Sequence, residues 1–147
     1  MQHKNRWFIA VLLIFATLLL AACSGSTSAA AKIEPALVEP IEGTEFNRLT
    51  LTDKAVERLD IQTDAVREEQ VNGAVRMVIP YSAILYDLNG ETWAYTNPEP
   101  NTYIRAPITI ESIDGDMVFL TDGPATGTTI VTVGAAELFG ADTGVGK

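Results

Sequence analysis

The sequence has little of the chemistry that most enzymes and metal sites use. Its only histidine, His3, and its only cysteine, Cys23, both lie within the first 23 residues. The rest of the chain therefore has no imidazole for acid–base catalysis or for zinc and copper, and no pair of thiols for a disulfide. Ser82 has no histidine partner and no Gly-x-Ser-x-Gly sequence around it, which argues against a nucleophilic serine. We expect a non-enzymatic protein with no catalytic residue, no cofactor and no metal site.

Basic side chains are also scarce. The chain has 10 lysines and arginines against 19 acidic residues, and two of the basic ones, Lys4 and Arg6, belong to an expected N-terminal leader. This acidic excess would repel nucleic-acid phosphates and anionic headgroups. We therefore expect no nucleic-acid partner and no electrostatic attachment to lipid.

The first 22 residues have the pattern of a secretory signal peptide. Lys4 and Arg6 precede an apolar run over residues 7–22, which ends in small residues. As a helix this run would be about 24 Å long, shorter than a hydrocarbon core of about 30 Å. We therefore expect a cleaved leader rather than a membrane span.

The end of the leader, Leu20-Ala21-Ala22-Cys23, resembles a bacterial lipobox. The resemblance implies cleavage before Cys23 and lipidation of its thiol, so that acyl chains hold the protein on a membrane. The expected location is the cell envelope, on the extracytoplasmic side of either the inner or the outer membrane. The alternative is an ordinary signal peptide that happens to end near a cysteine.

Composition divides the rest of the chain into three parts. Residues 23–45 are small, polar, acidic or proline and have no sustained period, which indicates a lipidated cysteine followed by a flexible tether. Residues 46–140 form the expected domain, and the glycine-rich residues 141–147 are expected to be a disordered tail.

One helix and several short strands are predicted within the domain. Thr52 is a good N-cap for a helix over residues 53–59, with Asp53 in its first turn. Strand patterns follow at 61–66, 75–79, 82–86, 103–113, 116–121 and 128–133, with a helical turn at 135–139. The prediction is a mainly β fold, a compact antiparallel roll or barrel of about six short strands with one short helix.

Two turns set the predicted hairpin registers. Asn89-Gly90 as a two-residue loop would place Tyr86 opposite Trp93. Asp114-Gly115 as the second loop would place Ile110 opposite Phe119. Pro107 lies inside the strand pattern, which indicates a sheet edge or a bulge.

Two sets of residues could suggest metal sites. Asp87, Asn89 and Glu91 invite a calcium interpretation, but Gly90 falls at the wrong place for an EF-hand loop, so a turn is the better interpretation. Met77 and Met117 are two methionines in strand patterns, which favours core packing over a soft copper site.

Two stretches together resemble periplasmic adaptor (membrane fusion) proteins of RND-type efflux pumps. Residues 49–61 are similar to the opening segment of these adaptors. Residues 78–83, 105–107 and 123–134, the last with Gly123-x-x-x-Gly127 and Ile130-Val131-Thr132-Val133-Gly134, are similar to their closing, membrane-proximal segment. Only residues 67–76 separate the two stretches, which leaves no room for the β-barrel, lipoyl-like domain and helical hairpin of a full adaptor.

The resemblance implies a membrane-proximal domain on its own, acting beside an efflux transporter. Its contact surface is expected on strand edges and loops, with Arg105 and exposed aromatic residues as candidate anchors. Two alternatives remain open at this point: a free-standing envelope module that binds a small ligand or metal, and a truncated remnant of an adaptor.

Overall fold

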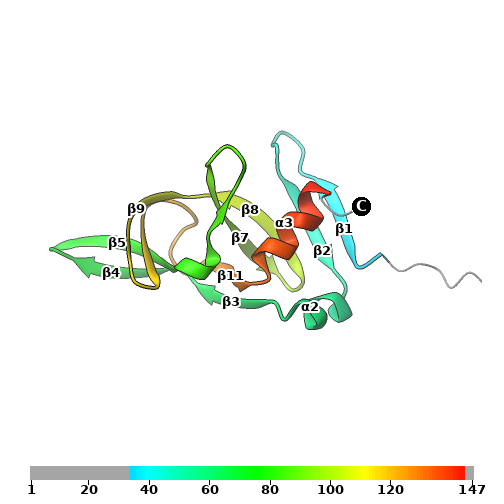
Figure 1. Ribbon diagram of the computed structural model, residues 1–147, viewed down its shortest axis with the longest axis horizontal. Helices are drawn as coiled ribbons and strands as arrows, with labels where there is room; N and C mark the ends of the chain where they lie inside the picture. The colour runs from blue at the N-terminus through cyan, green and yellow to red at the C-terminus, as the bar shows by residue number, and fades with distance from the viewer. Residues whose placement is uncertain (1–33, 145–147) are drawn as a thin grey trace, which may run out of the picture. The chain divides into compact units, whose positions relative to one another are not determined.

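The computed structural model describes residues 34–144 (Figure 1). The predicted signal peptide over residues 1–22 and the predicted lipidation site Cys23 lie outside the described residues. Within residues 34–144, no helix has the length and apolar character that crossing a bilayer requires.

The described residues are mainly β, as the sequence predicts, but they form no closed barrel. They contain eleven strands rather than about six, together with two α-helices and one short 3-10 helix. The elements in chain order are β1 (Ala36–Pro40), β2 (Asn47–Leu51), α2 (Asp53–Leu59), β3 (Gln62–Ala65), β4 (Arg67–Val71), β5 (Ala74–Pro80), η2 (Tyr81–Ala83), β6 (Leu85–Tyr86), β7 (Thr92–Glu99), β8 (Thr102–Pro107), β9 (Thr109–Asp114), β10 (Met117–Asp122), β11 (Thr129–Val133) and α3 (Ala135–Thr143).

The strands form two antiparallel sheets. The larger sheet has the order β1-β2-β8-β7-β11-β3, with the short β6 paired to β7. The smaller sheet has the order β4-β5-β10-β9. The chain passes from the larger to the smaller sheet directly after Pro107, which ends β8, so Pro107 separates two strands where the sequence suggested one.

The larger sheet is buried on both faces. Tyr95 and Val131 point to one face, where they pack with residues of α2 and α3. Ala94 and Ile130 point to the opposite face, where they pack with residues of the smaller sheet. Because neighbouring residues of a strand point to opposite faces, β7 and β11 contribute side chains to both cores. The larger sheet therefore lies between the helices on one side and the smaller sheet on the other.

The prediction for helix α2 is confirmed. Thr52 is its N-cap and accepts a hydrogen bond from the Ala55 backbone N–H at 3.2 Å, and Asp53 lies in its first turn. Asp60 ends the helix in the left-handed region with φ of 49°. Ala55 is buried in the core, and Val56 and Leu59 pack against the same cluster.

The predicted boundaries of the domain are wrong at both ends. The tether expected over residues 23–45 contains β1, which pairs with β2 from Ala36 opposite Leu51 to Pro40 opposite Asn47. Ala36 and Val38 pack against the core, and the flanking prolines suit an edge strand. At the other end, α3 continues to Thr143, so most of the described part of the expected tail is helical.

The junction between β11 and α3 depends on a glycine. Gly134 has φ of 88°, and a Cβ at this position would collide with the Ile61 side chain. This close approach joins the end of α2 to the start of α3.

Both predicted hairpin registers are wrong by one residue or more. Tyr86 pairs with Thr92, and Leu85 pairs with Trp93. Phe119 pairs with Ser112, whereas Ile110 pairs with Leu120 across an irregular stretch of the ladder. A slip of one residue moves every side chain of a strand to the opposite face, so Tyr86 and Trp93 lie on opposite faces of the first hairpin.

A third hairpin was not predicted. Asn72 and Gly73 both have positive φ, 52° and 81°, and connect β4 to β5 as a two-residue turn with Val71 opposite Ala74. Positive φ at both turn residues is typical of a type I′ turn. The residues expected only to link two segments thus form the edge of the smaller sheet.

Candidate functional site

The turn interpretation of Asp87, Asn89 and Glu91 is confirmed. The Asp87 backbone N–H donates to the Glu91 carbonyl at 3.0 Å, and the Gly90 N–H donates to the Asp87 carbonyl at 3.1 Å. Gly90 has φ of 84°. This is a three-residue hairpin loop with a glycine in the left-handed position; residues 87–91 are called the Asp87 loop below.

The Asp87 carboxylate organises this loop. Its Oδ1 accepts the backbone N–H groups of Asn89 at 2.8 Å and Glu91 at 2.9 Å, and its Oδ2 accepts the indole N–H of Trp93 at 3.4 Å. Desolvation raises the pKa of Asp87, but the hydrogen bonds from Glu91, Asn89, Trp93 and Gly90 outweigh it and lower the pKa overall. Asp87 is therefore ionised at neutral pH.

Trp93 links the Asp87 loop to a cluster around one arginine. The guanidinium carbon of Arg105 lies 4.7 Å from the Trp93 ring centre, 5.7 Å from Phe139 and 6.0 Å from Phe46. Phe46 meets Trp93 edge to face, with ring centres 5.7 Å apart. Aromatic faces attract a cation in this range, so β2, β7, β8 and α3 converge on Arg105.

The partner of Arg105 is a carboxylate on the last helix. The Asp142 side chain is only 1 % exposed, and its Oδ2 lies 3.6 Å from Arg105 Nε. Asp142 also accepts hydrogen bonds from the Tyr95 hydroxyl and from the Asn47 amide, both at 2.8 Å. Arg105, Asp142, Tyr95, Asn47 and the three aromatic rings are called the Arg105 cluster below.

Tyr95 titrates far from its ordinary range in this environment. Burial raises the pKa of its hydroxyl most, and the hydrogen bond to Asp142 and the charge of Asp142 raise it further, against a smaller opposite effect of Arg105. Tyr95 is thus a fixed hydrogen-bond donor to Asp142 and not an acid or base for catalysis at ordinary pH.

The expectation that Arg105 anchors a partner is wrong. Its side chain is only 16 % exposed, and its charge is shared between Asp142 and the aromatic rings. The sequence analysis also missed Asp142, because it lies in a glycine-rich stretch assigned to the tail. One sequence signal could have found Asp142: if the helix continues beyond residue 139, Leu138, Phe139 and Asp142 share one side of it.

The exposed aromatic residues expected as anchors do exist beside the Asp87 loop. Tyr86 is 52 % exposed and Tyr81 is 47 % exposed. Desolvation, followed by the charge and the hydroxyl of Tyr81, raises the pKa of Tyr86, so the two rings are neighbours. Leu88, at the apex of the loop, is fully exposed.

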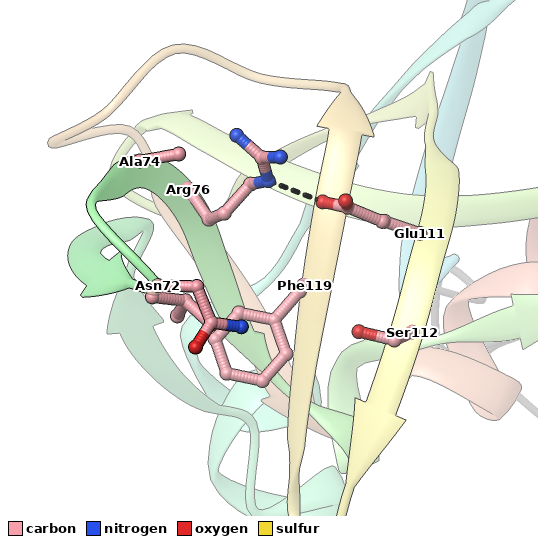
Figure 2. A pocket seen from close by; sticks show the side chains of 7 residues that line it. Asn72, Ala74, Arg76, Glu111, Ser112 and Phe119 are labelled. Carbon is pink, nitrogen blue, oxygen red and sulfur yellow. Dashed lines mark ion pairs between the residues drawn. The ribbon is translucent and has the colours of Figure 1, made fainter.

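Hollows also open on the described surface. One of about 240 Å³ lies on the smaller sheet, with Phe119 at its base and Arg76 paired with Glu111 across β10 (Figure 2). Another of about 410 Å³ lies beside the Asp87 loop and is lined by Trp93, Pro107 and Ile108 among others. Within residues 34–144, no three His, Cys, Asp or Glu side chains are grouped as a metal site would need.

Comparison with protein-family models, with curated proteins and with solved structures finds no match for this chain.

Proposed function

We propose that this protein is a lipid-anchored, non-enzymatic accessory protein of the cell envelope that associates with an RND-type efflux transporter. In this proposal Cys23 carries the acyl chains, and the domain described above is a membrane-proximal adaptor module that acts without a helical hairpin. Its role is to bind another protein during transport across the membrane.

The position of the Asp87 loop, at the end of the larger sheet away from the chain entry, supports the proposal. The chain enters the domain at Pro35, whose carbonyl accepts the Thr52 N–H at the start of α2. The turn between β1 and β2 lies at the opposite end of these strands, and Phe46 there contacts Trp93, which bonds Asp87. The Asp87 loop, with its exposed Leu88, thus belongs to the end of the sheet away from the chain entry (Figure 1). A tethered body that exposes an apolar side chain at its far end is compatible with a protein-binding role.

The packing of the adaptor-like stretches also supports the proposal. Leu49, Leu51 and Ala55 of the first stretch share one buried cluster with Val131 of the second. Two segments that are similar to the opening and closing parts of one domain would be expected to pack together in this way.

The length of the tether is compatible with action close to a bilayer. Ten residues lie between Cys23 and Glu34. A fully extended chain of this length spans at most about 40 Å. An acylated Cys23 would therefore hold the body within reach of the extracytoplasmic part of a membrane protein.

The test is recovery of transporter subunits with the full-length protein from crosslinked cells. We expect an acylated Cys23 by intact mass and transporter subunits enriched over a Cys23→Ser control, which lacks the thiol for acylation. The absence of transporter subunits from the acylated protein would overturn the association, and an unacylated Cys23 in the mature protein would overturn the anchor.

A further inference from the structure

The apex of the Asp87 loop combines two properties that rarely occur together. Leu88 is fully exposed, whereas the backbone around it is fixed. Two backbone hydrogen bonds close the loop, and three more groups donate to the Asp87 carboxylate. A mobile loop would lose conformational freedom on binding, but a loop held in this way has already lost it. Leu88 is therefore presented as a preorganised apolar anchor.

The support beneath the loop is also rigid. Trp93 is buried, donates to Asp87 and stacks on Arg105, whose ion pair with Asp142 ties the loop to α3. The Arg105 cluster therefore does more than fill the core. Through Trp93 it holds the Asp87 loop in one orientation.

Acidic residues lie on both sides of the exposed leucine in the sequence and at the same end of the sheet. Asp87 and Glu91 flank it within the loop, and Glu42 and Glu45 are exposed in the turn between β1 and β2 at the same end of the sheet. The positive charge of Arg105 lies below and is balanced by Asp142. The exposed cation nearest to that turn, Arg48, sits opposite Glu39 in the β1–β2 ladder. The surface around Leu88 is therefore acidic.

We propose that the Asp87 loop is a docking element that inserts Leu88 into an apolar pocket rimmed by lysine or arginine side chains on a partner protein. Tyr86 and Tyr81 extend the contact along one side of the hairpin. An apolar centre with a charged rim is the usual arrangement of a protein interface. This inference rests on the proposed function and names the surface that would meet the transporter.

A bilayer is a poorer fit for this loop than a protein pocket. Inserting Leu88 into headgroups would carry Asp87 and Glu91 toward anionic lipid, which repels them. A basic rim on a protein would instead attract the same carboxylates and increase the association rate at low salt.

The experiment places a photo-crosslinking amino acid at position 88 in the full-length protein in cells. A matched control carries it at position 75, because Val75 is also exposed but lies on β5 of the smaller sheet. We expect adducts from position 88 that map to an apolar pocket with lysine or arginine at its rim, and few adducts from position 75. Adducts at position 88 that contain only lipid, or equal adducts at both positions, would overturn the docking inference.

A pair of substitutions separates this inference from the proposed function. We expect Leu88→Asp to reduce co-purified transporter at least about tenfold, as loss of a central anchor does, whereas Val75→Asp leaves it within about twofold. Both side chains are exposed, so neither change should alter the melting temperature by more than a few degrees. Unchanged transporter recovery with Leu88→Asp overturns the docking surface but not the association. A basic-rimmed pocket on a protein other than the transporter sustains the docking surface and overturns the association.

Discussion

The two faces of the larger sheet are built in different ways. The face toward the smaller sheet is covered by aliphatic side chains and alanines, among them Ile79, Leu120 and Ile130. The face toward the helices carries Tyr95 and Tyr103 in addition to leucines, and beside them lies the buried ion pair of Arg105 with Asp142. Apolar contacts stabilise without fixing direction, whereas hydrogen bonds and ion pairs impose geometry. The difference indicates that both faces stabilise the domain, and that the polar face also orients its far end.

The largest loss of stability is expected when the Asp142 carboxylate is removed from the helix-side face. Asp142→Ala leaves the Arg105 cation, the Tyr95 hydroxyl and the Asn47 amide without their shared acceptor. We expect a loss of about 3–5 kcal/mol in the free energy of unfolding, measured in urea. Asp122→Ala, at an exposed position of β10, is the control and should cost less than about 0.5 kcal/mol. Equal small losses would mean that Asp142 does not hold the polar face together.

The aliphatic face should respond to loss of volume. Leu120→Ala removes a fully buried side chain between the sheets and should cost about 2–5 kcal/mol in the same urea measurement. Leu138→Ala on the helix side should cost a similar amount, because Leu138 is also fully buried. If Leu120→Ala costs less than about 1 kcal/mol, the buried volume of the aliphatic face does not stabilise the domain.

Tyr95→Phe should lower the free energy of unfolding by a smaller amount, and the loss should depend on pH. Loss of the hydroxyl should cost about 1–2 kcal/mol at neutral pH, since Asp142 loses a donor. The pKa of Tyr95 is raised in the folded state, so its contribution is complete below the unfolded tyrosine pKa of about 10 and is lost as pH rises above it.

Thermal unfolding between pH 8 and 11 measures this contribution. Wild-type stability should fall above pH 10, and the fall should be shallower in the Tyr95→Phe protein. Burial alone also raises the pKa of Tyr103, so the fall should be reduced rather than abolished. An unchanged slope would contradict the burial of an un-ionised Tyr95 against Asp142.

The smallest effect on stability is expected from replacing the ion pair altogether. The triple substitution Arg105→Met, Asp142→Leu and Tyr95→Phe removes both charges together with the buried hydroxyl that donates to Asp142. Buried pairs replaced by apolar residues often leave stability within about 1 kcal/mol. Hydrogen exchange at the Asn89 and Glu91 amides should nevertheless become faster, because Trp93 loses its stacked cation. Protection equal to that of the wild type would show that the polar face does not orient the Asp87 loop.

Local chemistry made parts of this fold predictable. The bounds of α2 follow within a few residues from Thr52 and Asp53 at its start and from the spacing of Ala55 and Leu59. The interactions that set these bounds lie within the helix and its caps. The Asn-Gly pairs show the limit of such reasoning. Asn72-Gly73 forms a two-residue turn, whereas Asn89-Gly90 lies in a three-residue loop because the Asp87 carboxylate bonds two backbone N–H groups there. A dipeptide predicts a hairpin, but a neighbouring side chain determines its register.

The Arg105 cluster could not be predicted from local patterns. Asn47 and Asp142 meet although 95 positions separate them in the sequence, and Tyr95 reaches Asp142 from the middle of the sheet. β1 was missed for a related reason, since its short run between two prolines becomes a strand only when it pairs with β2. Both features depend on pairing between distant segments, which composition and hydrophobic periodicity do not reveal.

The position of β11 sets the order in which the domain can be completed. Of the strands in residues 34–144 it is the last in chain order, yet it lies inside the larger sheet between β7 and β3. Neither β7 nor β3 has its inner neighbour until Val133 has been synthesised and, for an exported chain, translocated. Such long-range pairing folds slowly and leaves strand edges open in the meantime. The larger sheet of a nascent chain therefore stays incomplete until residues 129–133 can pair.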